Sequence, residues 1–447
     1  MIFSAPRFVV IDDKQHHLNA IAETFNHLGA SCMGVLFDPA EDLDATLLRG
    51  VRCLFVDLHL VEGIASTDHR RHFATIAGIL ETSISESGGP FVLVVWTEHQ
   101  QLSSDLRAYL DENLDPGKPH ARPLAVLSLG KDQFIDVESG DVHNPAELRE
   151  AILGKINEIP QLAALLGWEA DVLGASAETL ASLLSLVPAG QRYGTRFPAA
   201  LDTVLSRLAR EAVGPTNVGT DRRAAISAAL APILADRIIN QDIAPDVRET
   251  WRHAVTRYDD DDLDDATAEE AGEINRMLHI ALPANETINP TDWGSVVGWP
   301  YERTDAGFQE HTGLTLRQMF CEEFKLRSRA IGTCNPVLVR IGAACDYAQN
   351  NRGPITFLFG IEIPEDAEKQ NGATLGNAIW QSPIFCSPIS SSPSRLYVHI
   401  RFPKSVLSTE CANWTAHYRL REQLLMHLIH TSSTYVSRPG TVQLPSA

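Results

Sequence analysis

The first 159 residues alternate between short apolar segments and segments with helical spacing, and this alternation most constrains the fold. The apolar segments cover 7–13, 32–37, 53–60, 91–97 and 124–131. Helical segments are predicted at 14–28, 39–49, 67–85 and 103–113, with a last one opening at Asn144-Pro145. Such alternation predicts a doubly wound, five-stranded parallel sheet with right-handed crossovers.

Polar side chains stand at the ends of four of these apolar segments. Asp12 and Asp13 close the first segment, and Asp57 ends the apolar run of the third. Thr97 ends the fourth and Lys131 ends the fifth. Because the carboxyl ends of parallel strands meet at one edge, where α/β folds keep their chemistry, we expect one shared site.

The residue types at this edge indicate phosphoryl transfer. Three carboxylates close together repel one another unless a cation lies among them, and hard carboxylate oxygens suit Mg²⁺. Asp57, on the central strand, is the expected acceptor, forming an aspartyl phosphate. Lys131 and Thr97 are expected to bind the oxygens of the new phosphoryl group.

In this order, these residues resemble the receiver domain of two-component response regulators, over residues 5–159. The resemblance implies a Mg²⁺ site formed by Asp12, Asp13, Asp57 and the backbone of His59. It also implies phosphorylation of Asp57 by a histidine kinase or phosphotransferase, and a shift of the Thr97 loop that carries the signal outward.

The sequence departs from the family pattern at three positions. Asp132 follows Lys131 where the family usually has Pro, and Ser128 stands where an aromatic switch residue is common. Glu98 replaces a small residue after Thr97, so we expect it to hinder attacking water and slow hydrolysis of the phosphate. A second interpretation stays open: a degenerate receiver that serves as a docking scaffold for a C-terminal enzymatic or toxin-like effector, in bacterial stress or phage defence.

The remainder of the chain predicts two further domains. Residues 160–283 are expected to form a helical linker or bundle, and 284–447 an α+β or small β-barrel output domain. The predicted helices cover 163–186, 197–213, 222–240, 245–257 and 266–280, and no strand is expected among them. Predicted strands of the last domain cover 336–341, 355–363 and 396–402, followed by an amphipathic helix at 418–433.

Composition limits the classes of partner. A net charge of −20 argues against nucleic acid, since phosphate binding depends on Lys and Arg. No apolar run is long enough for a bilayer, and the start lacks the pattern of a signal peptide, so we expect a cytoplasmic protein without a membrane partner. A protein partner is expected for the last domain, a homodimer is left open, and no enzymatic activity is expected beyond the phosphoacceptor chemistry.

Residues outside the strand ends could also carry chemistry, and the first alternative is catalysis or metal binding by cysteines. Cys345 could act as a nucleophile with His399 or His417 as base, although no nucleophile motif surrounds it. Zinc ligation by four cysteines is a further alternative, although the seven cysteines of the chain include no Cys-x-x-Cys pair. The four are Cys334, Cys345, Cys386 and Cys411.

Charged clusters give three more alternatives. The acidic run 259–270 is interpreted as a hydrated loop rather than a calcium site, because it lacks the pattern of an EF-hand. His16 and His17 are interpreted as solvated or helix-capping. Four arginines could form a phosphate-binding face or serve as solubilising charge: Arg395, Arg401, Arg419 and Arg421.

Overall fold

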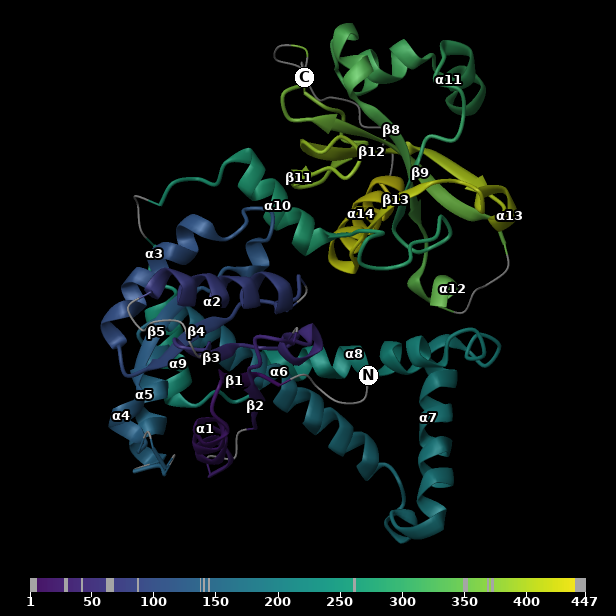
Figure 1. Ribbon diagram of the computed structural model, residues 1–447. Coiled ribbons are helices and arrows are strands. Elements are labelled where there is room, and N and C mark those ends of the chain that lie inside the picture. Colours follow the sequence, from purple (N-terminus) through teal and green to yellow (C-terminus); the bar gives the residue numbers. More distant parts are fainter. Residues whose placement is uncertain are drawn as a thin grey trace. The chain divides into compact units, whose positions relative to one another are not determined.

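The computed structural model divides the chain into two compact units (Figure 1). The N-terminal unit comprises Met1–Ala175 and Asn240–Asp260, and the C-terminal unit comprises Ser176–Ile239 and Asp261–Ala447. The structure describes residues 6–27, 31–41, 43–61, 68–86, 88–136, 138–139, 141–143, 145–259, 263–348, 353–367, 370 and 374–438, without the side chains of His27 and Cys345. The predicted division at 159 and 283 stays a prediction.

The N-terminal unit contains a five-stranded parallel sheet, as predicted. Its strands are β1 (Phe8–Asp12), β2 (Cys32–Leu36), β3 (Cys53–Asp57), β4 (Val92–Thr97) and β5 (Ala125–Gly130). The strand order is β2-β1-β3-β4-β5. The direction of winding therefore reverses between β1 and β3, and in open α/β sheets such a switch point forms the ligand-binding crevice.

Helices cover both faces of this sheet (Figure 1). On one face lie α1 (Gln15–His27), α4 (Lys131–Phe134) and α5 (Pro145–Asn157), and on the other α2 (His69–Ser83) and α3 (Ser103–Asn113). On β3, Leu54 and Val56 pack on the side of α2 and α3, whereas Phe55 packs on the side of α1, α4 and α5. Both faces of the central strand are buried, which explains its uninterrupted apolar sequence.

The prediction of a helix at 39–49 is wrong. The structure has a single 3-10 turn there, η1 (Ala45–Leu48). Asp38 accepts a hydrogen bond from the backbone N–H of Ala40 (2.8 Å), and Asp44 accepts one from that of Thr46 (2.9 Å). These local bonds compete with those of a helix, because short acidic side chains can satisfy nearby backbone donors. Two further 3-10 turns of this unit are η2 (Gln100–Leu102) and η3 (Pro119–Ala121).

The middle of the chain is helical, in agreement with the sequence pattern. The helices are α6 (Pro160–Ser185), α7 (Phe197–Val213), α8 (Arg222–Asn240), α9 (Pro245–Ala254) and α10 (Ala268–His279), with 3-10 turns η4 (Ala189–Gln191) and η5 (Gly194–Arg196). One strand, β6 (Ile280–Ala281), lies where none was expected. It pairs with β13 and so belongs to the C-terminal sheet.

The C-terminal unit is built on a curled antiparallel sheet, which agrees with the predicted α+β layout. Its order is β10-β12-β9-β8-β7-β13-β6, with β11 paired to β12. The strands not yet given are β7 (Ser295–Gly298), β8 (Asn335–Ile341), β9 (Ile355–Pro364), β10 (Ile379–Gln381), β11 (Phe385–Cys386), β12 (Pro393–Val406) and β13 (Ala416–Leu420). The helical elements are α11 (Asp305–Thr312), η6 (Gln318–Glu323), η7 (Ser328–Thr333), α12 (Ala344–Ala348), α13 (Ser408–Cys411) and α14 (Glu422–Val436).

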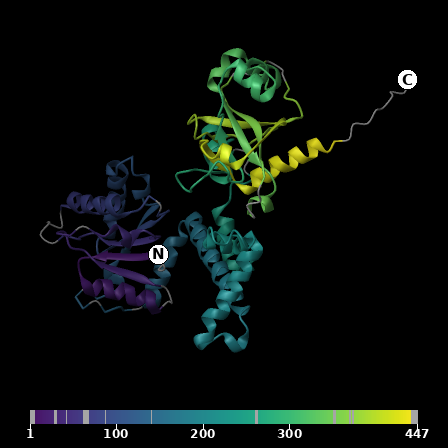
Figure 2. The same ribbon diagram turned by 90° about the vertical axis from the view of Figure 1, so that its right-hand side faces the viewer.

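The predicted starting residue of the helix at 418–433 is wrong. Tyr418 lies in β13, and α14 begins only at Glu422. The Tyr418 side chain is fully buried, and its hydroxyl donates to Glu362 on β9 (2.5 Å), which anchors this segment as a strand. The helix that follows packs against the sheet through Leu424 and Leu425. Figure 2 shows this helix in yellow, running on toward the C-terminus.

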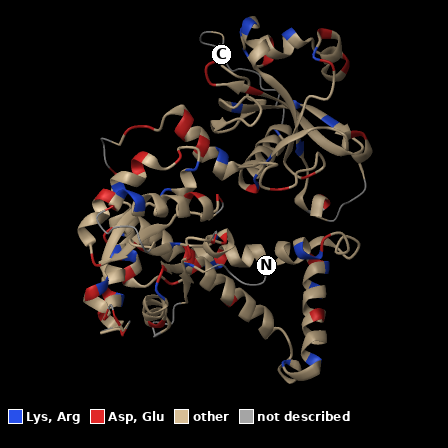
Figure 3. Ribbon diagram, in the orientation of Figure 1, with Lys and Arg blue, Asp and Glu red and all other residues tan. Residues whose placement is uncertain are grey.

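Aspartates and glutamates are distributed over the helices of both units (Figure 3). Along the described part of the chain, no helix is long and apolar enough to cross a membrane.

Candidate functional site

The strand ends of the N-terminal sheet bring the predicted residues together. Asp12 ends β1, Asp57 ends β3, Thr97 ends β4, and Lys131 opens α4 directly after β5. Ligand oxygens of Asp12, Asp13 and Asp57 lie within 4.8 Å of one another. A cavity of about 190 Å³ at this edge is lined by Asp13, Lys14, His17, Asp57, His59, Thr97, Glu98, His99 and Lys131.

Lys131 joins two of the three carboxylates. Its Nζ lies 2.6 Å from Asp12 Oδ2 and 2.9 Å from Asp57 Oδ2, and its side chain is only 4% exposed. A buried ammonium that lacks such partners would be strongly destabilised. The pairing therefore fixes Lys131 beside the carboxylate of Asp57.

The pKa values of Asp12, which ends β1, and of Asp13, which follows it, are shifted in opposite directions. Burial alone would raise the pKa of Asp12, but its hydrogen bond with His17 and the charge of Lys131 outweigh burial and lower that pKa to about 2. Burial raises the pKa of Asp13 to about 6, and the negative charges of Asp57 and Asp12 act in the same direction. The site therefore holds one well-compensated carboxylate and one for which burial and the neighbouring carboxylates outweigh the charge of Lys131.

Asp13 provides the test of whether these residues suit a divalent cation. Its Oδ1 is buried and has no hydrogen-bond partner among the residues that the structure describes. An unpartnered carboxylate oxygen beside two further carboxylates matches the oxygen-rich sites that Mg²⁺ prefers. The donor set therefore fits such an ion. Near it, the backbone N–H of His59 donates to Asp57 Oδ1 (3.3 Å).

Thr97 and Glu98 stand at the mouth of the cavity. Thr97 is buried, and its hydroxyl accepts a hydrogen bond from the backbone N–H of His99 (3.1 Å). Glu98 is exposed and lines the same cavity. Ser128 lies on β5 opposite Val95, two residue pairs before the end of β4 at Thr97.

His17 is a site residue that the sequence interpretation missed. The expectation that it is solvated or capping is wrong, because its side chain is 1% exposed. Its Nδ1 lies 3.3 Å from Asp12 Oδ1 and 3.1 Å from Lys131 Nζ. One signal was available: His17 immediately precedes Leu18 on the helix, and Leu18 is part of the apolar face.

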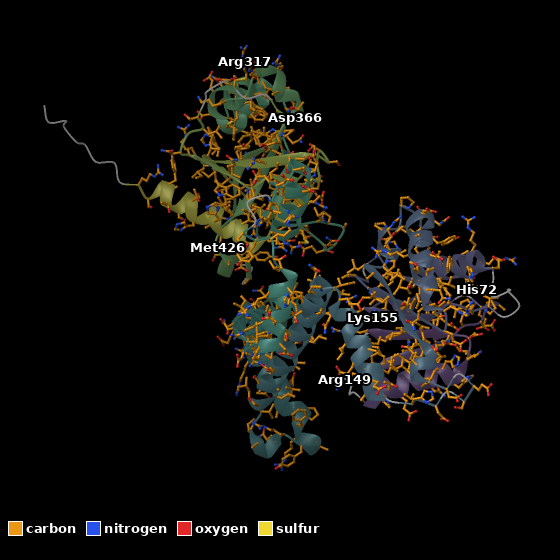
Figure 4. The ribbon with its side chains drawn as sticks, turned by 90° about the vertical axis from the view of Figure 1, so that its left-hand side faces the viewer. His72, Arg149, Lys155, Arg317, Asp366 and Met426 are labelled. Atoms are coloured by element: carbon orange, nitrogen blue, oxygen red, sulfur yellow. The ribbon has the colours of Figure 1, made fainter. Side chains whose placement is uncertain are left out.

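A group of histidines next to Asp57 was also not anticipated. The ring of His59 lies 4.6 Å from that of His72 and 5.4 Å from that of His99, measured between centroids. His72, labelled in Figure 4, is buried on α2. Burial lowers the pKa of His59, and its histidine neighbours add to this effect against the charge of Asp57.

The structure tests only part of the two cysteine alternatives, a Cys345 nucleophile and a zinc site. The side chain of Cys345 lies outside the described residues, and His399 pairs with Glu323, its Nε2 lying 2.8 Å from Oε2. Within the described residues, the three aspartates are the one group arranged to hold a metal, so the predicted cysteine set does not form a zinc site there.

The charged alternatives are likewise settled only in part. The acidic run includes residues 260–262, which lie outside the described residues. Three of the four arginines are paired with glutamates: Arg395 with Glu365, Arg401 with Glu323 and Arg419 with Glu286. These four do not form a single unpaired positive face.

Comparisons with known proteins add little to this geometry. No family model matches the sequence, and no curated protein gives a significant match. Among solved structures, full-length FixJ from B. japonicum matches with 12% sequence identity and a TM-score of 0.19, over 54% of this chain and 100% of that chain. The site itself, rather than this likeness, is what supports a functional conclusion.

Proposed function

We propose that the N-terminal unit is the receiver of a response-regulator-type signalling protein and accepts a phosphoryl group on Asp57. The observation that carries this proposal is the position of Lys131, whose Nζ contacts both Asp57 and Asp12 at the switch point of the sheet. A fixed cation beside one of three clustered carboxylates is the arrangement needed to receive a phosphoryl group.

In the proposed reaction, an oxygen of Asp57 forms a bond to phosphorus while the bond between phosphorus and the donor's leaving group breaks. The product is an aspartyl phosphate. Lys131 is already 2.9 Å from Asp57 Oδ2, so it can contact a phosphoryl oxygen as negative charge is transferred there. Thr97 can donate its hydroxyl proton to a second oxygen while it accepts from His99.

Asp12, Asp13, Asp57 and the backbone of His59 would hold the metal. When bound, Mg²⁺ would neutralise charge on the group being transferred. The Oδ1 of Asp13 supports this assignment, since no donor in the described part of the chain contacts that oxygen. Binding of the cation would remove the repulsion among the three carboxylates.

We propose a slow return to the unphosphorylated state. Glu98 lines the cavity next to Thr97, and its carboxylate would stand in the approach of a hydrolytic water. A negative charge there also opposes attack by hydroxide.

The proposed donors are a histidine kinase or a phosphotransferase, and the proposed output is binding of a protein by residues 284–447. On this proposal residues 1–159 receive the signal in the cytoplasm, and the helical segment 160–283 transmits it. The departures at Ser128 and Asp132 mean that a different relay must carry the signal from Asp57.

Beryllofluoride, which takes the place of a phosphoryl group on an aspartate, provides the test. Together with Mg²⁺ it should raise the melting temperature of the full chain, because a ligand that binds only the folded state stabilises it. Omission of Mg²⁺, or the substitution Asp57→Asn, should abolish the rise. An unchanged melting temperature in the wild type, or an equal rise in Asp57→Asn, would leave the docking scaffold as the better account.

A further inference from the structure

A second candidate site lies in the C-terminal unit, far along the chain from Asp57. It is a cavity of about 280 Å³ beside β12 and α11. Its lining combines aromatic rings with cationic and hydroxyl groups. The residues that matter are Trp299, His311, Thr312, Arg401, Phe402 and Lys404.

A bulge in β12 forms one wall of this cavity. His399 pairs with Phe359 on β9, and the next paired residue is Pro403, opposite Leu358. Residues 400–402 therefore have no partner on β9, although consecutive residues of β9 remain paired. Bulges redirect side chains and are enriched next to functional sites. Here the bulge places Arg401 and Phe402 at the cavity.

The two cations are held by different contacts. Arg401 donates to Glu323 Oε2 (2.7 Å), an oxygen that also lies 2.8 Å from His399 Nε2. Lys404 Nζ lies 3.3 Å from His311 Nδ1 and 4.4 Å from the ring centroid of Tyr301. In the described part of the chain, no carboxylate lies within ion-pair distance of Lys404.

Two buried donors beside this cavity lack partners. Trp299 Nε1 and Tyr301 OH are both buried without a hydrogen-bond partner in the part of the chain that the structure describes. Trp299 lines the cavity, and Tyr301 adjoins it, because its ring stacks on that of the lining residue His311, with centroids 3.6 Å apart. Buried polar groups in proteins are almost always hydrogen-bonded, so each unpartnered one requires an explanation.

We infer that this cavity binds a small organic anion with a flat apolar part, such as an aromatic carboxylate. The polar lining consists of cations and donors, and none of the described residues that line the cavity is acidic. The indole N–H and the ammonium suit a carboxylate, while Trp299 and Phe402 supply an apolar wall for a ring. Glu310 and Glu410 influence Lys404 from outside the lining, and they would disfavour a dianion more than a monoanion.

The test uses benzoate as the probe and the indole N–H signal of Trp299 in the NMR spectrum of the full chain, assigned with Trp299→Phe. Benzoate at about millimolar concentration, where fragments of this size bind, should shift that signal saturably. Benzylamine, which has the same ring and the opposite charge, should not. Inorganic phosphate, a dianion without a ring, should shift it less than benzoate.

Two variants define the site. Lys404→Met keeps the apolar stem and removes the charge, so it should weaken benzoate binding about tenfold or more, as expected for loss of a charged hydrogen bond. The matched control is Lys155→Met on α5, a surface lysine labelled in Figure 4, which should leave binding unchanged. Trp299→Phe, followed by calorimetry, should weaken binding to a similar degree.

Three outcomes would overturn the inference. They are the absence of any saturable shift with benzoate, equal binding of benzylamine, and unchanged affinity in both Lys404→Met and Trp299→Phe. A variant that fails to fold would be recognised from its amide spectrum, and the wild-type comparison of benzoate with benzylamine then decides the question alone.

Discussion

At the scale of single residues, the acceptor site depends on how one ammonium is shared among three carboxylates. Lys131 compensates Asp12 and Asp57, whereas Asp13 keeps a buried oxygen without a partner. Clustered carboxylates repel one another, so a cation bound among them would relieve this repulsion.

Removal of the Asp13 charge should reduce the stabilisation by Mg²⁺ and raise the stability of the Mg²⁺-free protein. In the wild type, Mg²⁺ at a hundredfold excess over its Kd should stabilise the folded state by about 2.7 kcal/mol. Asp13→Asn should lose most of this gain and should melt higher than the wild type in EDTA, because repulsion is relieved. Differential scanning fluorimetry measures both, with Asp202→Asn on α7 as an exposed control. Equal stabilisation of Asp13→Asn and wild type by Mg²⁺ would exclude Asp13 as a ligand.

A buried carboxyl of the C-terminal unit predicts a pH dependence of stability. Glu362 is 1% exposed and accepts hydrogen bonds from Ser387 (2.6 Å) and Tyr418 (2.5 Å). Burial raises its pKa above the ordinary value of 4.5, against these hydrogen bonds. The folded state thus binds the proton more tightly than the unfolded state, so this group's contribution falls as pH rises above about 4.5.

The variant Glu362→Gln isolates this effect. Its free energy of unfolding relative to wild type should shift in favour of the variant as pH rises from 4.5, measured by urea denaturation at several pH values. The control Glu365→Gln changes an exposed glutamate that pairs with Arg395 and should show little such trend. A difference between Glu362→Gln and wild type that does not vary with pH would contradict the account.

At the scale of elements, the sequence was informative wherever an element is buried on both faces. The apolar run ending at Asp57 predicted β3 and placed the Asp57 carboxylate at the end of that strand, because a buried parallel strand requires such a run. It was not informative for 39–49, where side-chain bonds of Asp38 and Asp44 replaced a helix. The bulge in β12 could not be predicted either, since strand register depends on long-range pairing that one sequence does not display.

The pairing of β9 with β12 depends on the absence of a side chain at Gly360. A Cβ atom there would lie 2.9 Å from the carbonyl oxygen of Tyr397, closer than real contacts allow. Gly360→Ala should therefore destabilise the C-terminal unit by about 1–3 kcal/mol, the usual cost of overpacking. Gly332→Ala is the matched control, since its Cβ would meet nothing within 4 Å. Equal melting temperatures for the two variants would argue against this close approach.

At the scale of the whole molecule, the chain forms two units, and α6 begins in one and ends in the other. The first part of α6 belongs to the N-terminal core, where Leu162 is 1% exposed. Glu169 on the same helix pairs with Arg52 (2.8 Å) and Arg7 (3.3 Å). The sequence alone placed a boundary at 159 because the alternation of strands and helices ends there, and it could not show these contacts.

A comparison of fragments tests how much of α6 the receiver-like fold needs. A fragment of residues 1–159 should be less stable than one of residues 1–175 by about 2 kcal/mol or more, since it loses the burial of Leu162 and the Glu169 ion pairs. Chemical denaturation of both fragments measures the difference. Equal stability would mean that α6 contributes nothing to this unit.

The central claim, that Asp57 accepts a phosphoryl group, is tested most directly by the mass of the intact chain after incubation with phosphoramidate and Mg²⁺. Phosphoramidate carries a phosphorus–nitrogen bond, as a phosphohistidine donor does. The account predicts addition of one phosphoryl group to the wild type, its removal by hydroxylamine, and no addition to Asp57→Asn. An unmodified wild type, or equal modification of Asp57→Asn, would contradict it.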